Sequence, residues 1–193
     1  MSLFDAGFEA AFVAGVLGDI LHEATVGLFE SSAYISNPSA EPSYLKYIDK
    51  HFNYRKDFSG KNISDVGMKK ACKLIEDCKA TNYKGKFGLG CVQWTGSRTK
   101  NLIDCYVDEC GEEGYPTREQ YYKAESTLIS KEFNGNYKKI YEEWLSKHSG
   151  KNTAAYEAGS MVCLKYEVPA DRYNKAKTRG KSAQKIYQAM MGA

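Results

Sequence analysis

The segment that decides the fold is Gly15-Val16-Leu17-Gly18-Asp19-Ile20-Leu21-His22-Glu23-Ala24-Thr25. It closes an apolar stretch whose hydrophobic residues recur at helical spacing: Phe8, Phe12, Val16 and Ile20 form one ridge, with Val13, Leu17 and Leu21 beside it. This pattern predicts a single helix over residues 4–26, with Gly27 as its stop. Because the apolar face is wide, we expect this helix to lie at the centre of the protein.

Glu23 falls in the last turn of this predicted helix. Carbonyl dipoles at a helix C-terminus and apolar neighbours both disfavour a negative charge, so we expect the pKa of its carboxyl to be raised. A carboxyl that holds its proton near neutral pH can act as a general acid on a glycosidic oxygen. The alternative is a surface glutamate paired with a basic residue.

A second informative segment runs from Gly85 to Gly96 and reads GKFGLGCVQWTG. Its four glycines among aromatic and β-branched residues predict a small hairpin or irregular strands, with backbone that approaches another group closely. Gln93 offers donors and acceptors for an N-acetyl or hydroxyl group. Trp94 offers a flat face, either for a sugar ring or for the core.

The remaining patterns are mostly helical. Helices are predicted over residues 64–79, from Ser97 through Tyr106, and over 137–147, 153–165 and 180–191; Thr117 and Gln120 form a capping-box pattern. The fold class is therefore α+β and predominantly α-helical. We expect two lobes within one domain of residues 1–193: a helical lobe of about 4–30 and 97–191, and a glycine-rich β or irregular lobe of about 31–96.

Size and charge narrow the function classes. A chain of 193 residues can bury roughly two-thirds of its unfolded surface without a covalent staple. Residues 165–185 carry seven bases against two acids, so this face could meet a polyanion, or it is simply solvated. Acids interrupt the first apolar run, which argues against a signal peptide and a membrane span. The abrupt start suggests a domain excised from a longer protein.

The chain contains six cysteines without CxxC spacing, which makes a zinc site a weak reading and favours mostly free, buried thiols. We expect no metal and no cofactor. A cysteine peptidase would use Cys91 as nucleophile with His22, His51 or His148 as base. Such a thiol usually lies at a helix N-terminus, whereas Cys91 lies in the glycine-rich segment.

Three segments, in order, resemble the phage tail lysozyme family. They are the segment that ends at Glu23 and Thr25, the segment Gly88–Thr95, and Leu164-Lys165-Tyr166-Glu167-Val168-Pro169-Ala170. The chain departs from the family pattern at His22 and Ala24, which flank Glu23, and in a longer stretch between residues 31 and 82.

The resemblance implies a lysozyme-like fold and cleavage of the bond between N-acetylmuramic acid and N-acetylglucosamine in peptidoglycan. Glu23 falls on the catalytic acid, and the substrate-binding candidates are Gly90, Gln93, Trp94, Thr95 and Tyr166. The expected setting is extracellular or facing a cell wall: a phage tail, the secretion apparatus of a mobile element, or a secreted protein. We expect a monomeric domain, fused to or assembled with other domains, and no nucleic-acid partner.

The second catalytic group stays open. Glu167 holds the motif position, Asp49, Asp57 and Asp65 are further candidates, and Tyr-Glu-Val-Pro is alternatively a structural corner. Glycosidases commonly use two carboxylates, about 5 Å apart for retention and ~6.5–9.5 Å apart for inversion. With one acid alone, the enzyme is a lytic transglycosylase that releases 1,6-anhydro products. A non-catalytic wall-binding module is the third reading.

Overall fold

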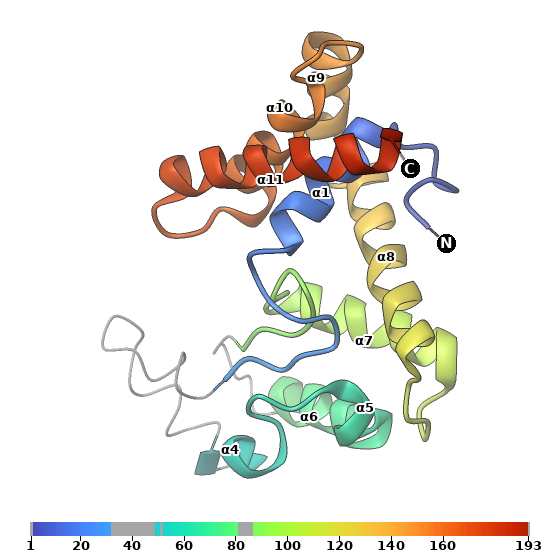
Figure 1. Cartoon of the computed structure of the whole chain (residues 1–193). Helices are drawn as coiled ribbons and strands as arrows, with labels where there is room; N and C mark the ends of the chain where they lie inside the picture. Colours follow the sequence, from blue (N-terminus) through green and yellow to red (C-terminus); the bar gives the residue numbers. More distant parts are fainter. Residues whose placement is uncertain (1, 32–48, 51, 81–86, 193) are drawn as a thin grey trace. The chain divides into compact units, whose positions relative to one another are not determined.

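The computed structural model describes residues 2–31, 49–50, 52–80 and 87–192 (Figure 1). Its helices are α1 (Ala10–Ile20), α4 (Tyr54–Asp57), α5 (Ile63–Val66), α6 (Met68–Ala80), α7 (Ser97–Cys110), α8 (Arg118–Asn134), α9 (Lys138–His148), α10 (Ala154–Val162), the π-helix η1 (Cys163–Glu167) and α11 (Arg172–Gly192). Strand pairing within these residues consists of isolated antiparallel bridges: Leu28 with Asn62, Phe29 with Leu89, and Leu89 with Trp94. The predicted predominantly helical α+β class is confirmed.

The chain divides into two compact units. Unit 1 comprises residues 1–23 and 129–193, and unit 2 comprises residues 24–128. These boundaries differ from the predicted lobes, because residues 24–30 and 97–128 fall together with the glycine-rich segment.

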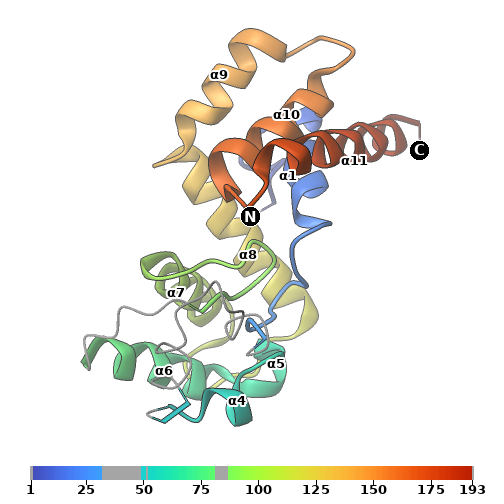
Figure 2. The same ribbon diagram turned by 90° about the vertical axis from the view of Figure 1, so that its left-hand side faces the viewer.

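Unit 1 is built around α1, which packs against α10 and α11; the three helices lie side by side in both views (Figures 1 and 2). Small residues line their contacts. A Cβ atom on Gly15 would lie 2.4 Å from Ala158 Cβ, and one on Gly18 would lie 2.6 Å from the Ala183 backbone nitrogen. The helix backbones therefore approach more closely than ordinary side chains permit, and we call these contacts the glycine seam.

Aromatic residues fill the rest of the unit 1 core. Phe12 is 1% exposed and contacts the rings of Phe8, Phe133, Tyr141 and Trp144. The buried indole of Trp144 donates to the Ala154 carbonyl at 2.9 Å, which satisfies its polar group. The predicted central place of the first helix is thus explained by its aromatic ridge on one side and its small residues on the other.

Unit 2 has its own aromatic core, in which Phe29, Tyr54, Phe58 and Phe87 pack together. The capping box at the start of α8 is confirmed: Thr117 N–H donates to Gln120 Oε1 at 2.8 Å, and Gln120 N–H donates to Thr117 Oγ1 at 3.3 Å.

Several predicted helix bounds were wrong. The first helix begins at Ala10 rather than residue 4, because Gly7 has a φ of +85° that no helix contains. The helix predicted over 64–79 is broken by Gly67, whose φ is +80°. The helix predicted over 153–165 ends at Val162 and continues as a π-helix, and the last helix begins at Arg172.

Candidate functional site

Glu23 lies in a turn directly after α1, where its N–H donates to the Ile20 carbonyl at 3.0 Å. Its side chain is only 16% exposed and forms an ion pair with the guanidinium of Arg179. The carboxyl is therefore largely withdrawn from water but still reachable from solvent. The ion pair stabilises the ionised carboxylate, and so opposes the effects of the helix end and of burial that the sequence predicts.

The same guanidinium holds a second carboxylate. Arg179 and Asp19 are 2% and 1% exposed, and Arg179 Nε lies 3.3 Å from Asp19 Oδ1. Arg179 Nη1 also donates to the Asp19 carbonyl at 2.9 Å. Burial raises the pKa of Asp19 to about 6, although the positive charge of Arg179 opposes the shift. One buried cation thus serves two carboxylates from the end of α1.

Glu167 belongs to this cluster too. Ligand atoms of Asp19, Cys163 and Glu167 lie within 4.8 Å of one another. Burial, together with the charge of Asp19, raises the pKa of Glu167 to about 7, and its Oε2 is buried without a hydrogen-bond partner. Such a group could in principle hold a metal, but the guanidinium against Asp19 already supplies a positive charge. We therefore attribute the cluster to ion pairing and proton binding.

The backbone that carries Glu167 is unusual. Glu167 ends the π-helix η1, and the following Val168 has a φ of 53°, in the left-handed region. A β-branched residue is strained in this region, and both π-turns and such strain occur often at functional sites. The predicted structural corner at Tyr-Glu-Val-Pro is real, and it turns Glu167 toward Asp19 and Cys163.

In unit 2, the glycine-rich segment forms a tight turn between Leu89 and Trp94, whose backbones exchange hydrogen bonds of 3.0 and 3.1 Å. Gln93 adopts a φ of 51°, and its amide donates to the carbonyls of Gly90 and Leu28 at 2.9 and 3.2 Å. Gln93 is therefore a half-buried support of the turn. Thr95, also half-buried, follows this turn.

The close approach predicted for the glycines is made to groups of the same unit. A Cβ atom on Gly88 would lie 2.4 Å from Gln93 Oε1, and one on Gly90 would lie 2.7 Å from Glu125 Oε1. Glu30 also holds this segment, because Gly88 N–H donates to Glu30 Oε2 at 2.7 Å. The glycines are thus required by packing.

Glu125 connects the turn to the rest of unit 2. It is 2% exposed and accepts hydrogen bonds from Gly27 N–H at 2.6 Å, Cys91 N–H at 2.8 Å and the Tyr106 hydroxyl at 2.5 Å. Burial raises the pKa of Glu125, although these donors favour its charged form. We call this arrangement the Glu125 clamp. It joins the segment after Glu23 to the glycine-rich turn and to α7.

Two of the predicted substrate contacts have little surface. Trp94 is 0% exposed, so no face of its ring is open to a sugar in this structure. Tyr166 is 3% exposed; its hydroxyl donates to Glu132, and its ring packs against Phe133 and Tyr137. Both residues therefore stabilise the cores of their units.

The cysteines lie as predicted: none of the six forms a disulfide, and Cys91, Cys105 and Cys163 are buried. The backbone N–H of Cys91 donates to the Glu125 carboxylate, and a thiolate beside that carboxylate would be unfavourable. This environment argues against Cys91 as a nucleophile.

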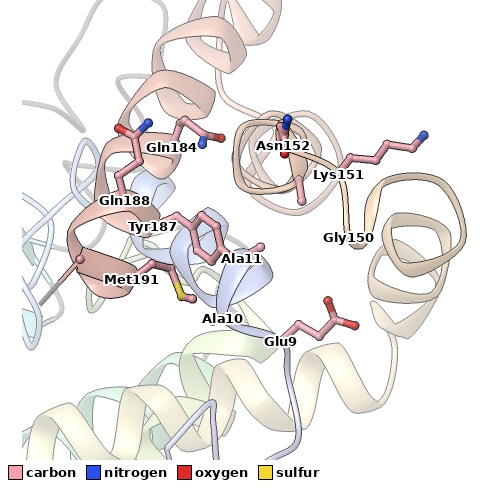
Figure 3. Close-up of a pocket in the computed structure, with 12 residues that line it drawn as sticks. Glu9, Ala10, Ala11, Gly150, Lys151, Asn152, Gln184, Tyr187, Gln188 and Met191 are labelled. Carbon is pink, nitrogen blue, oxygen red and sulfur yellow. The ribbon is translucent and has the colours of Figure 1, made fainter.

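A pocket of unit 1 lies elsewhere (Figure 3). It has a volume of about 740 Å³ and is lined by the start of α1, the loop at Gly150–Asn152 and the end of α11, including Gln184, Tyr187 and Gln188. Glu9, on its rim, accepts hydrogen bonds from the Ser149 hydroxyl at 2.8 and 3.0 Å. None of Asp19, Glu23, Glu167 and Arg179 lines this pocket, so we place the candidate chemistry at their cluster.

The profile of the phage tail lysozyme family matches residues 1–190. The chain belongs to the phage tail lysozyme family. This membership covers nearly the whole sequence and confirms the resemblance drawn from the three segments. The comparisons with curated proteins and with solved structures gave no significant match. Family membership indicates an enzyme that degrades peptidoglycan and acts at a phage tail or cell wall. Of the helices that the structure describes, none is both long and apolar enough to cross a membrane.

Sequence reasoning missed Asp19 and Arg179 as members of this candidate cluster. Asp19 carried a usable signal, because an acid four residues before Glu23 in an apolar helix requires a buried partner. Arg179 carried none, since it is one of seven bases in a stretch expected to be solvated.

Proposed function

We propose that this protein is a muramidase, which hydrolyses the bond between N-acetylmuramic acid and N-acetylglucosamine with Glu23 as the general acid. The observation that carries the proposal is the place of Glu23: it falls on the family's catalytic segment, in the turn directly after α1, and its side chain is 16% exposed. A carboxyl that is fixed in position and mostly shielded from water suits proton transfer to a leaving oxygen.

Glu167 is the proposed second carboxylate. Its pKa of about 7 lets it lose or gain a proton near neutral pH, as a general base requires. Its position on a strained π-turn supports a functional role. Gln93 and Thr95 are proposed to bind the glycan, while Gly90, Trp94 and Tyr166 would support substrate binding through the packing of their own units.

The test is Glu23→Gln in a turbidity assay on Gram-positive cell walls. The substitution keeps the shape of the side chain and removes its proton, so we expect lysis to fall at least ~100-fold. Glu142→Gln is the matched control, because Glu142 is an exposed α9 residue whose contact is a surface ion pair with Lys138. Lysis by Glu23→Gln within a few-fold of this control would reject Glu23 as the acid.

Mass spectrometry of the products distinguishes the remaining readings. A reducing muramic acid end supports hydrolysis, whereas a 1,6-anhydro end would show a lytic transglycosylase. If the protein pellets with the walls and no soluble fragment is released, the protein is a binding module. Glu167→Gln is expected to abolish hydrolysis as Glu23→Gln does, and unchanged activity would exclude it as the second carboxylate.

A further inference from the structure

Arg179 is a buried base in a stretch of sequence that is otherwise rich in exposed bases. The residues around it on α11 include exposed bases such as Lys177 and Lys181, yet Arg179 itself is 2% exposed. Gly159 is responsible for part of this placement, because a Cβ atom there would lie 2.9 Å from the Arg179 carbonyl oxygen. The backbone of α11 is thereby held against α10, and the guanidinium reaches the end of α1.

Arg179 pairs with two carboxyl groups. Asp19 contacts it from α1 and Glu23 from the turn after α1, while Glu167 and Cys163 of η1 and Lys175 of α11 lie around Asp19. His22 points elsewhere, with its Nε2 2.7 Å from the exposed Ser182 hydroxyl. One buried guanidinium is therefore shared by two carboxyl groups. Since an uncompensated buried charge is costly, these carboxyls compete for the same cation.

We propose that Arg179 is a positioning residue that fixes the Glu23 carboxyl and, because it also binds Asp19, couples the proton affinity of Glu23 to the charge of Asp19. When Asp19 is neutral, the guanidinium acts on Glu23 alone and stabilises its carboxylate. When Asp19 ionises, it shares the guanidinium, and Glu23 holds its proton more tightly. The ionisation of Asp19 thus favours the protonated form that a general acid needs.

The inference rests on Glu23 as the acid, but it is testable without activity. Carbon-13 NMR of protein labelled at the glutamate carboxyl reports the titration of Glu23, and its signal is identified by its loss in Glu23→Gln. Arg179→Met is expected to raise the pKa of Glu23 by about one unit or more, the usual effect of losing an opposite charge in contact. Asp19→Asn is expected to lower it. Lys177→Met, which removes an exposed neighbouring base, is the matched control and should leave it unchanged.

A structural role alone would destabilise unit 1 without these opposite shifts. An unchanged pKa of Glu23 in Asp19→Asn would overturn the coupling. Because this variant preserves the shape of the side chain, it provides the test if Arg179→Met does not fold. Arg179→Lys keeps the charge but not the planar fork, so it should retain the pKa of Glu23 while kcat falls at least about tenfold. Full lysis by Glu23→Gln would instead reject the proposed function. The titration of Glu23 in the Arg179 and Asp19 variants would still test the coupling.

Discussion

The glycine seam makes a quantitative prediction for Gly18→Ala. The added Cβ would lie 2.6, 2.7 and 2.8 Å from Ala183 N, Cα and Cβ, and the first two are backbone atoms that cannot rotate away. Relief requires the shortest contact to lengthen from 2.6 to at least 3.4 Å, which separates α1 from α11. Overpacking of this kind costs about 1–3 kcal/mol, and we take the upper end because backbone is involved.

Helix propensity acts in the opposite direction. Alanine is favoured over glycine inside a helix by about 1 kcal/mol, which leaves a net destabilisation of about 2 kcal/mol. For a chain of this size, that corresponds to a fall in Tm of about 4–8 °C. Gly192→Ala is the matched control, since nothing lies within 4 Å of its added Cβ. Thermal denaturation followed by circular dichroism measures both. A Gly18→Ala protein as stable as the wild type, or more stable, would refute the close approach of α1 and α11.

Two further predictions concern buried carboxyls. Folding raises the pKa of Asp19 from 3.8 to about 6, so its stabilising contribution is complete well below pH 3.8 and is lost as pH rises through 6. Urea unfolding should show the wild type losing about 3 kcal/mol relative to Asp19→Asn between pH 3 and pH 8, and parallel curves would contradict this. Glu125→Gln replaces an acceptor oxygen with an amide donor, which would face the N–H and O–H donors of the Glu125 clamp. The free energy of unfolding should therefore fall by at least ~2 kcal/mol. An unchanged midpoint of urea unfolding would show that the clamp does not stabilise unit 2.

Local chemistry explains what could be predicted from the sequence. The capping box at Thr117 and Gln120 depends on two residues three apart, so it follows from the chain alone. The glycines at 88 and 90 predicted a close approach of backbone, but not that the partners would be Gln93 and Glu125. A glycine-rich pattern indicates that another group lies close to the backbone. Which group this is depends on tertiary packing.

The missed features depend on tertiary contacts. The periodicity of residues 153–165 does not distinguish an α-helix from one that widens into a π-turn at Cys163. The direction of Arg179 depends on which face of α11 meets α1 and α10, and seven bases within 21 residues make that face look solvated. The predicted environment of Glu23 included the helix end and apolar neighbours but omitted the cation that binds it.

The glycine seam also affects how tolerance to substitution will map onto this chain. Gly15, Gly18 and Gly159 carry no functional group, yet their neighbours leave no room for a methyl group. In a saturation library screened for lysis, these positions should be as intolerant as Glu23, and a map of intolerant residues would merge them with the catalytic centre. A parallel screen for folded, protease-resistant protein separates the two classes, because substitutions at Glu23 would pass it while those at the glycines would fail.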